Sequence, residues 1–327
     1  MPARARSRLA EAALALASVV VFLLLAEAAL RVLGQADERP TGYAPVNTRR
    51  RDRRPTNSLG YRDVERARPK PAGVRRVVSL GDSFAWGVGI EHDDTYARRV
   101  ERALDRRPGE RWEVVQLARP GMGTVEQAEQ LAEEGFAYEP DVVVLGFVLN
   151  DSEDENAAEA RRARDWEETR RERQERRSGR RFLDRSALWR FVAGRLEATG
   201  QNRRRLEAYR SQFLPGYPGW AACRGALARM GALCRERHVP FVVMIFPLFA
   251  DPLDERYPFA DIHAQVAQAA REDGAVVIDL LPAYRGLRSE LLVVDGANDE
   301  HPNEIAHRVA AQELLRTLDR LVPPPSR

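Results

Sequence analysis

The sequence is poor in cysteine and has no large surplus of either charge. Its 327 residues include two cysteines, and 52 basic residues stand against 49 acidic ones, for a formal net charge of +3. This near balance argues against a dedicated nucleic-acid-binding protein, which would carry a clustered basic surplus. Cys223 and Cys234 fall in one helical pattern, roughly 16 Å apart along the helix axis. That separation excludes a disulfide between them, so we expect two small thiols that fill the core.

Signatures of common cofactors are also missing from the sequence. The histidines and cysteines do not fall at the spacings of a zinc site, and no glycine-rich loop ends in Lys-Ser or Lys-Thr. No predicted strand is followed by the G-x-G-x-x-G pattern of a dinucleotide site. We therefore expect a protein that needs neither a cofactor nor a metal.

Charge is nearly absent from most of residues 9–33, which are rich in Ala, Leu and Val. Residues 12–26 form an uncharged centre, and Arg4, Arg6 and Arg8 precede it. The centre is shorter than the roughly 20 residues of a spanning helix, but its flanks can extend it into the interface. The arginines favour a cytoplasmic N-terminus and an exported body.

Two other interpretations of residues 1–33 stay open. Ala26-Glu27-Ala28 is a passable cleavage site for a signal peptide, and a cytosolic helix is the third possibility. An anchor and a cleaved signal would both place the rest of the chain, after residue 33, outside the cytoplasm, in the periplasm or at the cell surface. We expect a membrane-anchored protein that touches the membrane through this helix.

Alternation of strand and helix patterns dominates the chain after a polar connector at residues 34–74. Short, β-branched apolar runs predict buried strands at 74–80, 112–118, 141–148, 240–246 and 274–280. Helical patterns lie at 95–107, 124–135, 220–237, 262–272 and 303–321. This alternation predicts a five-stranded parallel sheet covered on both faces, with all strand C-terminal ends at one edge.

Residues 151–219 interrupt the alternation, since they contain no strand-like run. The first half is almost wholly charged, whereas Leu188, Val192 and Leu196 in the second half are spaced as one helix face requires. We predict a helical insertion at the strand-end edge. Its charged run has two interpretations. It is either a solvated helix face, or it forms a lid or a contact surface for an anionic polymer or lipid.

Four residues that can take part in catalysis lie directly after predicted strands or before the last predicted helix. Ser83, in "GDS", follows the first strand and is a candidate nucleophile or a helix cap. Gly121 follows the second strand and Asn150 the third, and His301 precedes the last helix. Gly121 is either a backbone N–H donor or a plain turn glycine, and Asn150 either a donor or a turn cap. Ligands of such sheets bind beyond the strand C-terminal ends, so all four groups can converge there.

Together these groups fit acyl transfer through a serine. A neutral serine needs a base, and His301 can act as one at neutral pH. Asp299 is the nearest carboxylate available to orient His301. The N–H groups of Ser83 and Gly121 and the amide of Asn150 would stabilise the oxyanion. His92, His238, His263 and His307 fit less well, and we expect surface or packing roles for them.

With these residues, the sequence resembles the SGNH (GDSL-type) hydrolase superfamily. The resemblance rests on four blocks in order: "GDSF" at 81–84, "QLARPGMGT" at 116–124, "VLND" at 148–151 and "DEHPN" at 299–303. Two supporting stretches, "NSLGYRD" and "YEPDVVVLGF", look like bacterial members with an N-terminal membrane segment. The similarity covers about residues 57–150 and 218–320.

The resemblance implies a flavodoxin-like three-layer α/β/α domain, which we place at residues 75–323. It also implies Ser83 as nucleophile, His301 as base, and Gly121 and Asn150 in the oxyanion hole. The second block departs from the usual pattern, with Gln116 and Ala118 in place of Asn and Gly. In the commoner Asp-x-x-His pattern the acid would fall at Asn298, so we assign it to Asp299. A Ser–His dyad assisted by a carbonyl remains the alternative.

These observations favour a serine esterase that hydrolyses O-acyl esters, such as acetyl esters, of a glycan or a lipid. Its alternatives are an O-acyltransferase that acylates a polysaccharide and a non-catalytic glycan- or lipid-binding domain.

Overall fold

The computed structural model describes residues 3–33, 56–152, 186–295 and 299–323. By its internal contacts the chain divides into two compact units. One unit comprises residues 1–40 and 158–207, and the other comprises residues 41–157 and 208–327.

The larger unit is built on a five-stranded parallel sheet with the strand order β2-β1-β3-β4-β5. The strands are β1 (Val74–Gly81), β2 (Arg111–Ala118), β3 (Val142–Phe147), β4 (Phe241–Ile245) and β5 (Val276–Asp279). This is the flavodoxin-like order, in which the direction of winding reverses between β1 and β3. The predicted fold class is confirmed, and every predicted strand run coincides with a strand.

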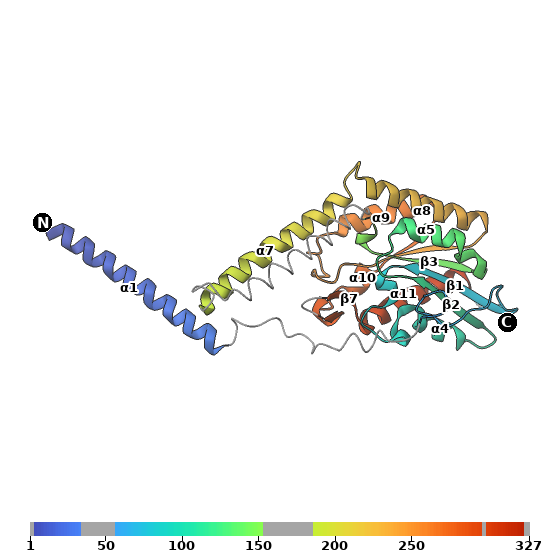
Figure 1. The fold of residues 1–327 in the computed structure, drawn as a ribbon, viewed down its shortest axis with the longest axis horizontal. Helices are drawn as coiled ribbons and strands as arrows, with labels where there is room; N and C mark the ends of the chain where they lie inside the picture. The colour runs from blue at the N-terminus through green and yellow to red at the C-terminus, as the bar shows by residue number, and fades with distance from the viewer. Residues whose placement is uncertain (1–2, 34–55, 153–185, 296–298, 324–327) are drawn as a thin grey trace. The chain divides into compact units, whose positions relative to one another are not determined.

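The helices cover both faces of this sheet (Figure 1). Helices α5, α8 and α9 lie on one face, and α4 and α11 pack together on the other. The longer helices of this unit are α4 (Tyr96–Asp105), α5 (Thr124–Glu133), α8 (Pro218–Glu236), α9 (Ala260–Glu272) and α11 (Glu304–Leu321). The short ones are α3 (Ser83–Trp86), η1 (His92–Asp94), η2 (Gly135–Tyr138), η3 (Leu149–Ser152), α10 (Leu281–Tyr284) and η5 (Ser289–Leu291). Because both faces are covered, β3 and β4 are buried along their whole length, as parallel strands require.

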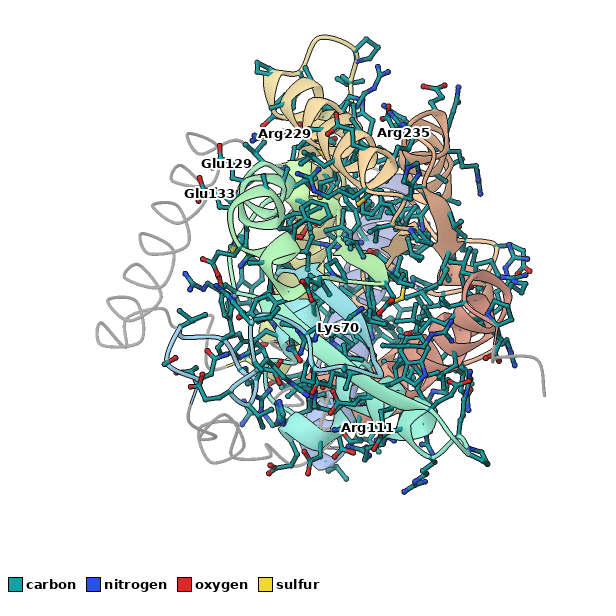
Figure 2. The ribbon with its side chains drawn as sticks, turned by 90° about the vertical axis from the view of Figure 1, so that its right-hand side faces the viewer. Lys70, Arg111, Glu129, Glu133, Arg229 and Arg235 are labelled. Atoms are coloured by element: carbon teal, nitrogen blue, oxygen red, sulfur yellow. The ribbon has the colours of Figure 1, made fainter. Side chains whose placement is uncertain are left out.

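The outer surfaces of these helices carry the charges that the core excludes. Figure 2 labels Glu129 and Glu133 of α5, and Arg229 and Arg235 of α8, all of which are exposed. The opposite face of α8 carries Cys223 and Cys234, which are buried and unbridged as expected. This division between charged and apolar faces orients each helix on the sheet.

A short hairpin not expected from the sequence follows the sheet. Strands β6 (Val293–Asp295) and β7 (Asp299–Pro302) pair antiparallel. Pro302 ends β7 instead of opening the last helix, since Asn303 caps α11 by accepting from the N–H groups of Ile305 and Ala306. The Asn303 side chain also donates to the carbonyls of Leu291 and Val293. Asn303 therefore fixes the hairpin to the start of α11.

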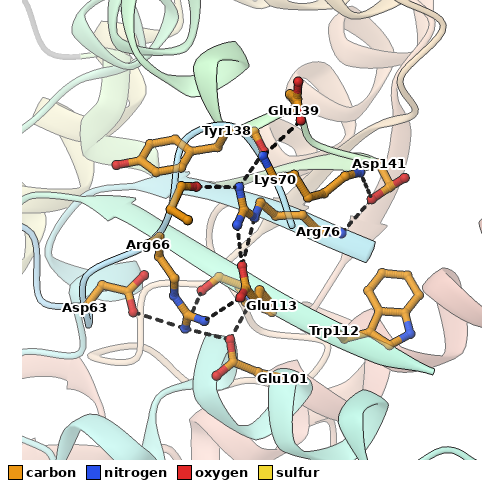
Figure 3. A network of polar contacts seen from close by, with 12 residues as sticks. Asp63, Arg66, Lys70, Arg76, Glu101, Trp112, Glu113, Tyr138, Glu139 and Asp141 are labelled. Carbon is orange, nitrogen blue, oxygen red and sulfur yellow. Dashed lines mark hydrogen bonds and ion pairs between the residues drawn. The ribbon is translucent and has the colours of Figure 1, made fainter. Parts of the chain in front are cut away.

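Polar residues before β1 are built into this unit through an ion-pair network (Figure 3). Arg66 pairs with Glu101 of α4 at 2.8 Å and with Asp63 at 3.3 Å. Arg76 of β1 is fully buried and pairs with Glu113 of β2. Since residues 57–70 make these contacts, we propose that the domain built on this sheet begins near residue 57, inside the segment expected to be a connector.

The smaller unit contains two long helices, α1 (Ala3–Val32) and most of α7 (Ala187–Gln212). Within the described residues, one helix is long and apolar enough to cross a membrane, the part of α1 from Glu11 to Val32. The Glu27 carboxylate accepts hydrogen bonds from the backbone N–H groups of Ala187 and Leu188, each at 2.8 Å. The predicted helix around Leu188 is present as α7, while most of the charged half of the predicted insertion lies outside the described residues.

Candidate active site

The turn after β1 brings a serine to the C-terminal ends of β1 and β3, where the strand order reverses. Gly81 ends β1 with φ +153°, and a Cβ atom at this position would lie 2.5 Å from the Cβ of Ala85. Only glycine allows so close an approach between the strand end and the next helix. Asp82 then caps α3 by accepting from the N–H of Phe84 at 2.8 Å. Ser83 is the first residue of α3, so the cap and the candidate nucleophile are neighbouring residues.

His301 lies beside Ser83 although 218 residues separate them. The distance from His301 Nε2 to Ser83 Oγ is 2.9 Å, and both side chains are half-buried. At this distance the imidazole is within reach of the hydroxyl proton, as a general base must be. The hairpin β6–β7 carries His301 to this place.

Asp82 connects Ser83 to the end of β3. Its Oδ2 accepts from Ser83 Oγ at 3.3 Å and from Asn150 Nδ2 at 3.5 Å. Asn150 belongs to η3, which follows β3 directly. The Asp82 carboxylate therefore links Ser83 to the side-chain amide of Asn150, which is predicted to bind the oxyanion. Its role as an oxyanion donor stays a prediction.

Two buried carboxylates set the charge around Asn150. Burial raises the pKa of the Asp82 carboxyl, against the opposing influences of the Phe84 N–H and of His301. Burial, followed by the neighbouring Asp82 charge, raises the pKa of Asp151 well above its ordinary value. Two like charges in one buried site do not both ionise readily. Burial therefore disfavours the charged form of both aspartates.

Gly121 lies in the turn between β2 and α5, with φ +82°. This turn reaches the end of β1, because the N–H of Arg119 donates to the carbonyl of Gly81 at 3.1 Å. It also approaches the end of β3, where a Cβ at Gly123 would lie 3.4 Å from the carbonyl oxygen of Asp151. Gly121 is therefore in the right loop for an oxyanion donor, and that role remains a prediction.

Asp299 opens β7, two residues before His301. Its side chain lies outside the described part of the structure, and so does the whole of Asn298. The assignment of Asp299 as the acid partner of His301 therefore stays a prediction.

An aromatic cluster that the sequence did not single out lies beside His301. The rings of Phe84 and His301 have centroids 5.4 Å apart, and Phe84 also contacts Phe246 and Phe249. Phe246 directly follows β4, so the strand-end position that indicated the other groups also marks this residue. Phe84 therefore packs on one side of the imidazole and is itself backed by Phe246 and Phe249.

The remaining histidines lie elsewhere. His263 is buried in α9, where Nδ1 is 2.8 Å from Asp279 Oδ1 and Nε2 is 3.2 Å from the Tyr257 hydroxyl. His307 is buried in α11, and its Nδ1 accepts from the N–H of Tyr96 at 3.1 Å. His92 is buried in η1, and His238 is exposed after α8. In the described residues, no three side chains of His, Cys, Asp or Glu form a group that could hold a metal ion.

The arrangement as a whole is suited to nucleophilic attack by Ser83 on an acyl carbon. A hydroxyl and an imidazole lie in hydrogen-bond contact at a topological switch point, where parallel α/β sheets bind their ligands. The serine is at the N-terminus of a short helix, and an amide-bearing residue follows the adjacent strand. These are the parts of a base-activated nucleophile beside a source of oxyanion donors.

Solved structures with a similar fold include several ester hydrolases. The TesA crystal structure aligns at a TM-score of 0.43 with 15% identity, covering 76% of this chain and 100% of that one. The lipase/acylhydrolase from Enterococcus faecalis aligns at 0.45 with 15% identity, over 77% and 100% of the two chains. The psychrotrophic esterase EstA from Pseudoalteromonas sp. aligns at 0.43 with 14% identity, over 76% and 100%. No curated protein matches the sequence.

A protein-family model gives the decisive assignment. The model of the GDSL-like lipase/acylhydrolase family matches residues 79–309. The match includes the turn that carries Ser83, the ends of β2 and β3, and the hairpin that carries His301. Because it spans well over half of the chain, the protein belongs to the GDSL-like lipase/acylhydrolase family and is a carboxylic ester hydrolase.

Proposed function

We propose that the protein is a membrane-anchored serine esterase that removes O-acyl groups, such as acetyl groups, from a glycan or a lipid. The observation that carries this proposal is the 2.9 Å contact between His301 Nε2 and Ser83 Oγ at the C-terminal ends of β1 and β3.

The proposed reaction has two halves. His301 takes the proton of Ser83 as Oγ attacks the ester carbonyl, and the tetrahedral intermediate then expels the alcohol, which receives that proton from His301. This leaves an acyl-serine. In the second half His301 deprotonates a water molecule, which attacks the acyl-serine, releases the carboxylic acid and restores the serine.

We assign the oxyanion donors to the backbone N–H groups of Ser83 and Gly121 and to the side-chain amide of Asn150. Such preorganised donors stabilise the negative charge only as it develops. Asp299 would accept from the far nitrogen of His301 and hold the ring in one tautomer.

The location of the substrate follows from the N-terminal helix. Three arginines precede the apolar stretch of α1, which favours a cytoplasmic N-terminus. The catalytic domain would then face the periplasm or the cell surface, where acylated glycans and lipids of the cell envelope are available.

A series of p-nitrophenyl esters of rising acyl length tests the proposal. We expect hydrolysis by the wild-type protein, a preference for one range of chain length, and no turnover by Ser83→Ala. Adding a polysaccharide acceptor separates hydrolysis from transfer, since faster acylation of the acceptor than release of acid would indicate an acyltransferase. A folded wild-type protein that turns over no ester and binds no fluorophosphonate would instead favour a glycan- or lipid-binding domain.

A further inference from the structure

Arg62 lies outside the residues matched by the family model, yet its side chain reaches the helix that begins with Ser83. Only 1% of Arg62 is exposed. Its Nη1 donates to the carbonyls of Trp86 at 3.1 Å and Gly87 at 2.5 Å, and its Nη2 donates to the carbonyl of Ile90 at 2.6 Å. One guanidinium thus binds three carbonyls of the α3 end and the turn after it.

Helix α3 depends on such outside partners because it has only four residues. The last four carbonyls of a helix have no partner within it. Here the N–H of Gly87 donates to the carbonyls of Ser83 and Phe84. Gln116 Nε2 donates to the carbonyl of Ala85 at 2.9 Å, and Arg62 donates to the carbonyl of Trp86. Two of the four carbonyls are therefore held by side chains from other parts of the chain.

The turn held by Arg62 also touches the hairpin that carries His301. A Cβ atom at Gly89 would lie 2.4 Å from Val294 of β6, so the backbone of the turn packs directly on that strand. Arg62 therefore holds a turn that ends the Ser83 helix on one side and supports the β6–β7 hairpin on the other.

The segment around Arg62 is itself firmly attached. Asp63 Oδ2 accepts from the N–H of Gln116 at 2.9 Å, and Arg98 of α4 pairs with Asp63 at 3.3 Å. The Tyr61 hydroxyl donates to Glu134 at 2.9 Å. Tyr61, Arg62 and Asp63 are all buried. The guanidinium is consequently fixed before any substrate binds.

We propose that Arg62 is a positioning residue for the ester hydrolysis, which sets the distance between Ser83 and His301 by holding the end of α3 and the following turn. This inference rests on the proposed roles of Ser83 and His301. It extends the catalytic apparatus to a segment that precedes the residues matched by the family model.

Arg76 offers a matched control for Arg62. It is also fully buried, and its Nη1 also donates to two carbonyls, those of Ala67 at 3.1 Å and Tyr138 at 2.8 Å. These two partners lie on the segment before β1 and on η2, and its ion-pair partner Glu113 lies on β2, so all three are on elements other than α3 and the hairpin. Loss of either arginine should lower the melting temperature, but only loss of Arg62 should disturb the serine and the histidine.

The test compares Arg62→Lys with Arg76→Lys in the full-length protein, using p-nitrophenyl acetate and the rate of fluorophosphonate labelling. A lysine keeps the charge but carries its three N–H donors on one nitrogen atom, so it cannot reproduce the planar fork whose two nitrogens reach Trp86, Gly87 and Ile90. We expect kcat to fall about 10- to 100-fold for Arg62→Lys, as for a small displacement of reacting groups, with KM unchanged. Arg76→Lys should keep a kcat close to wild type. Low-millimolar guanidinium should restore part of the kcat of Arg62→Ala and leave that of Arg76→Ala unchanged.

Equal kcat values for folded Arg62→Lys and Arg76→Lys, with an active wild type, would overturn the positioning role and leave the proposed function intact. A wild-type protein without esterase activity would instead contradict the proposed function itself. If Arg62→Ala does not fold, the two lysine variants still decide the question, since both retain the buried charge.

Discussion

At the scale of single residues, the Asp82 side chain connects the other residues of the site by hydrogen bonds. It caps α3, it accepts from Ser83, and it accepts from Asn150. The sequence offered two interpretations of "GDS", a helix cap and a candidate nucleophile, and the two turn out to be compatible. The aspartate provides the cap, and Ser83 Oγ lies closer to His301 Nε2, at 2.9 Å, than to Asp82 Oδ2, at 3.3 Å.

Asn150 gives the sharpest prediction at this scale. Asn150→Ala removes one proposed oxyanion donor and should lower kcat by roughly 10²–10³-fold with little change in KM. Steady-state kinetics on a p-nitrophenyl ester measures this directly. Asn202→Ala is a suitable control because Asn202 is exposed on α7. A folded Asn150→Ala protein with wild-type kcat would remove Asn150 from the oxyanion hole.

At the scale of secondary-structure elements, the central strands were the most predictable because β3 and β4 are buried on both faces. Runs such as "DVVVLGF" have no alternation of polar residues and fit a central parallel strand. The groups placed at the ends of β1 and β3 could be located for the same reason, since the topology fixes where those ends meet. Ser83, Asn150 and the loop of Gly121 all follow from this rule.

The β6–β7 hairpin could not be predicted in this way. Its second strand, "DEHP", is polar and lacks an alternating pattern, and it is held by the side chain and backbone of Asn303. The role of residues 57–70 was hidden for a similar reason. Arg62 looks like part of a polar connector, because its three carbonyl partners are 24 to 28 residues away in the chain.

His307 joins two elements, α11 and the start of α4, and gives a pH prediction at this scale. Burial lowers the pKa of His307 to about 3, assisted by the positive charges of Arg99 and Arg62. The unfolded chain takes up a proton near pH 6.5, whereas the folded protein does not until far lower pH. This group therefore stabilises the fold above pH 6.5, and its contribution is lost as the pH falls from 6.5 toward 3.

Urea unfolding at several pH values tests this prediction. Between pH 6 and pH 4, the wild-type unfolding free energy should lose up to about 1.4 kcal/mol per pH unit through His307. His307→Gln keeps an acceptor for the Tyr96 N–H but does not titrate, so its curve should be flatter. Parallel pH dependences for the two proteins would show that His307 does not remain neutral in the fold.

At the scale of the whole molecule, the chain combines an apolar N-terminal helix with an ester hydrolase domain. From Glu11 to Val32 none of the helix is buried in the structure, and most of its apolar side chains are exposed. By length and composition such a helix can cross a membrane. The positive charges that precede it set the expected orientation.

Reporter fusions after Arg327 test this orientation. If the N-terminus is cytoplasmic and the domain is exported, a C-terminal alkaline phosphatase should be active and a C-terminal green fluorescent protein dark. Intact mass of the membrane-bound protein would separate an anchor from a cleaved signal, because cleavage after Ala28 removes the apolar helix. A fluorescent fusion with an inactive phosphatase would place the domain in the cytoplasm and contradict the proposed location.

The central claim is that Ser83 is the nucleophile and His301 its base, and the most direct measurement is mass-spectrometric mapping of a fluorophosphonate adduct on the full-length protein. We expect one adduct on Ser83 in the wild type, none in Ser83→Ala, and strongly slowed formation in His301→Ala at pH 7. An adduct on another residue, or labelling of folded His301→Ala at the wild-type rate, would contradict the account.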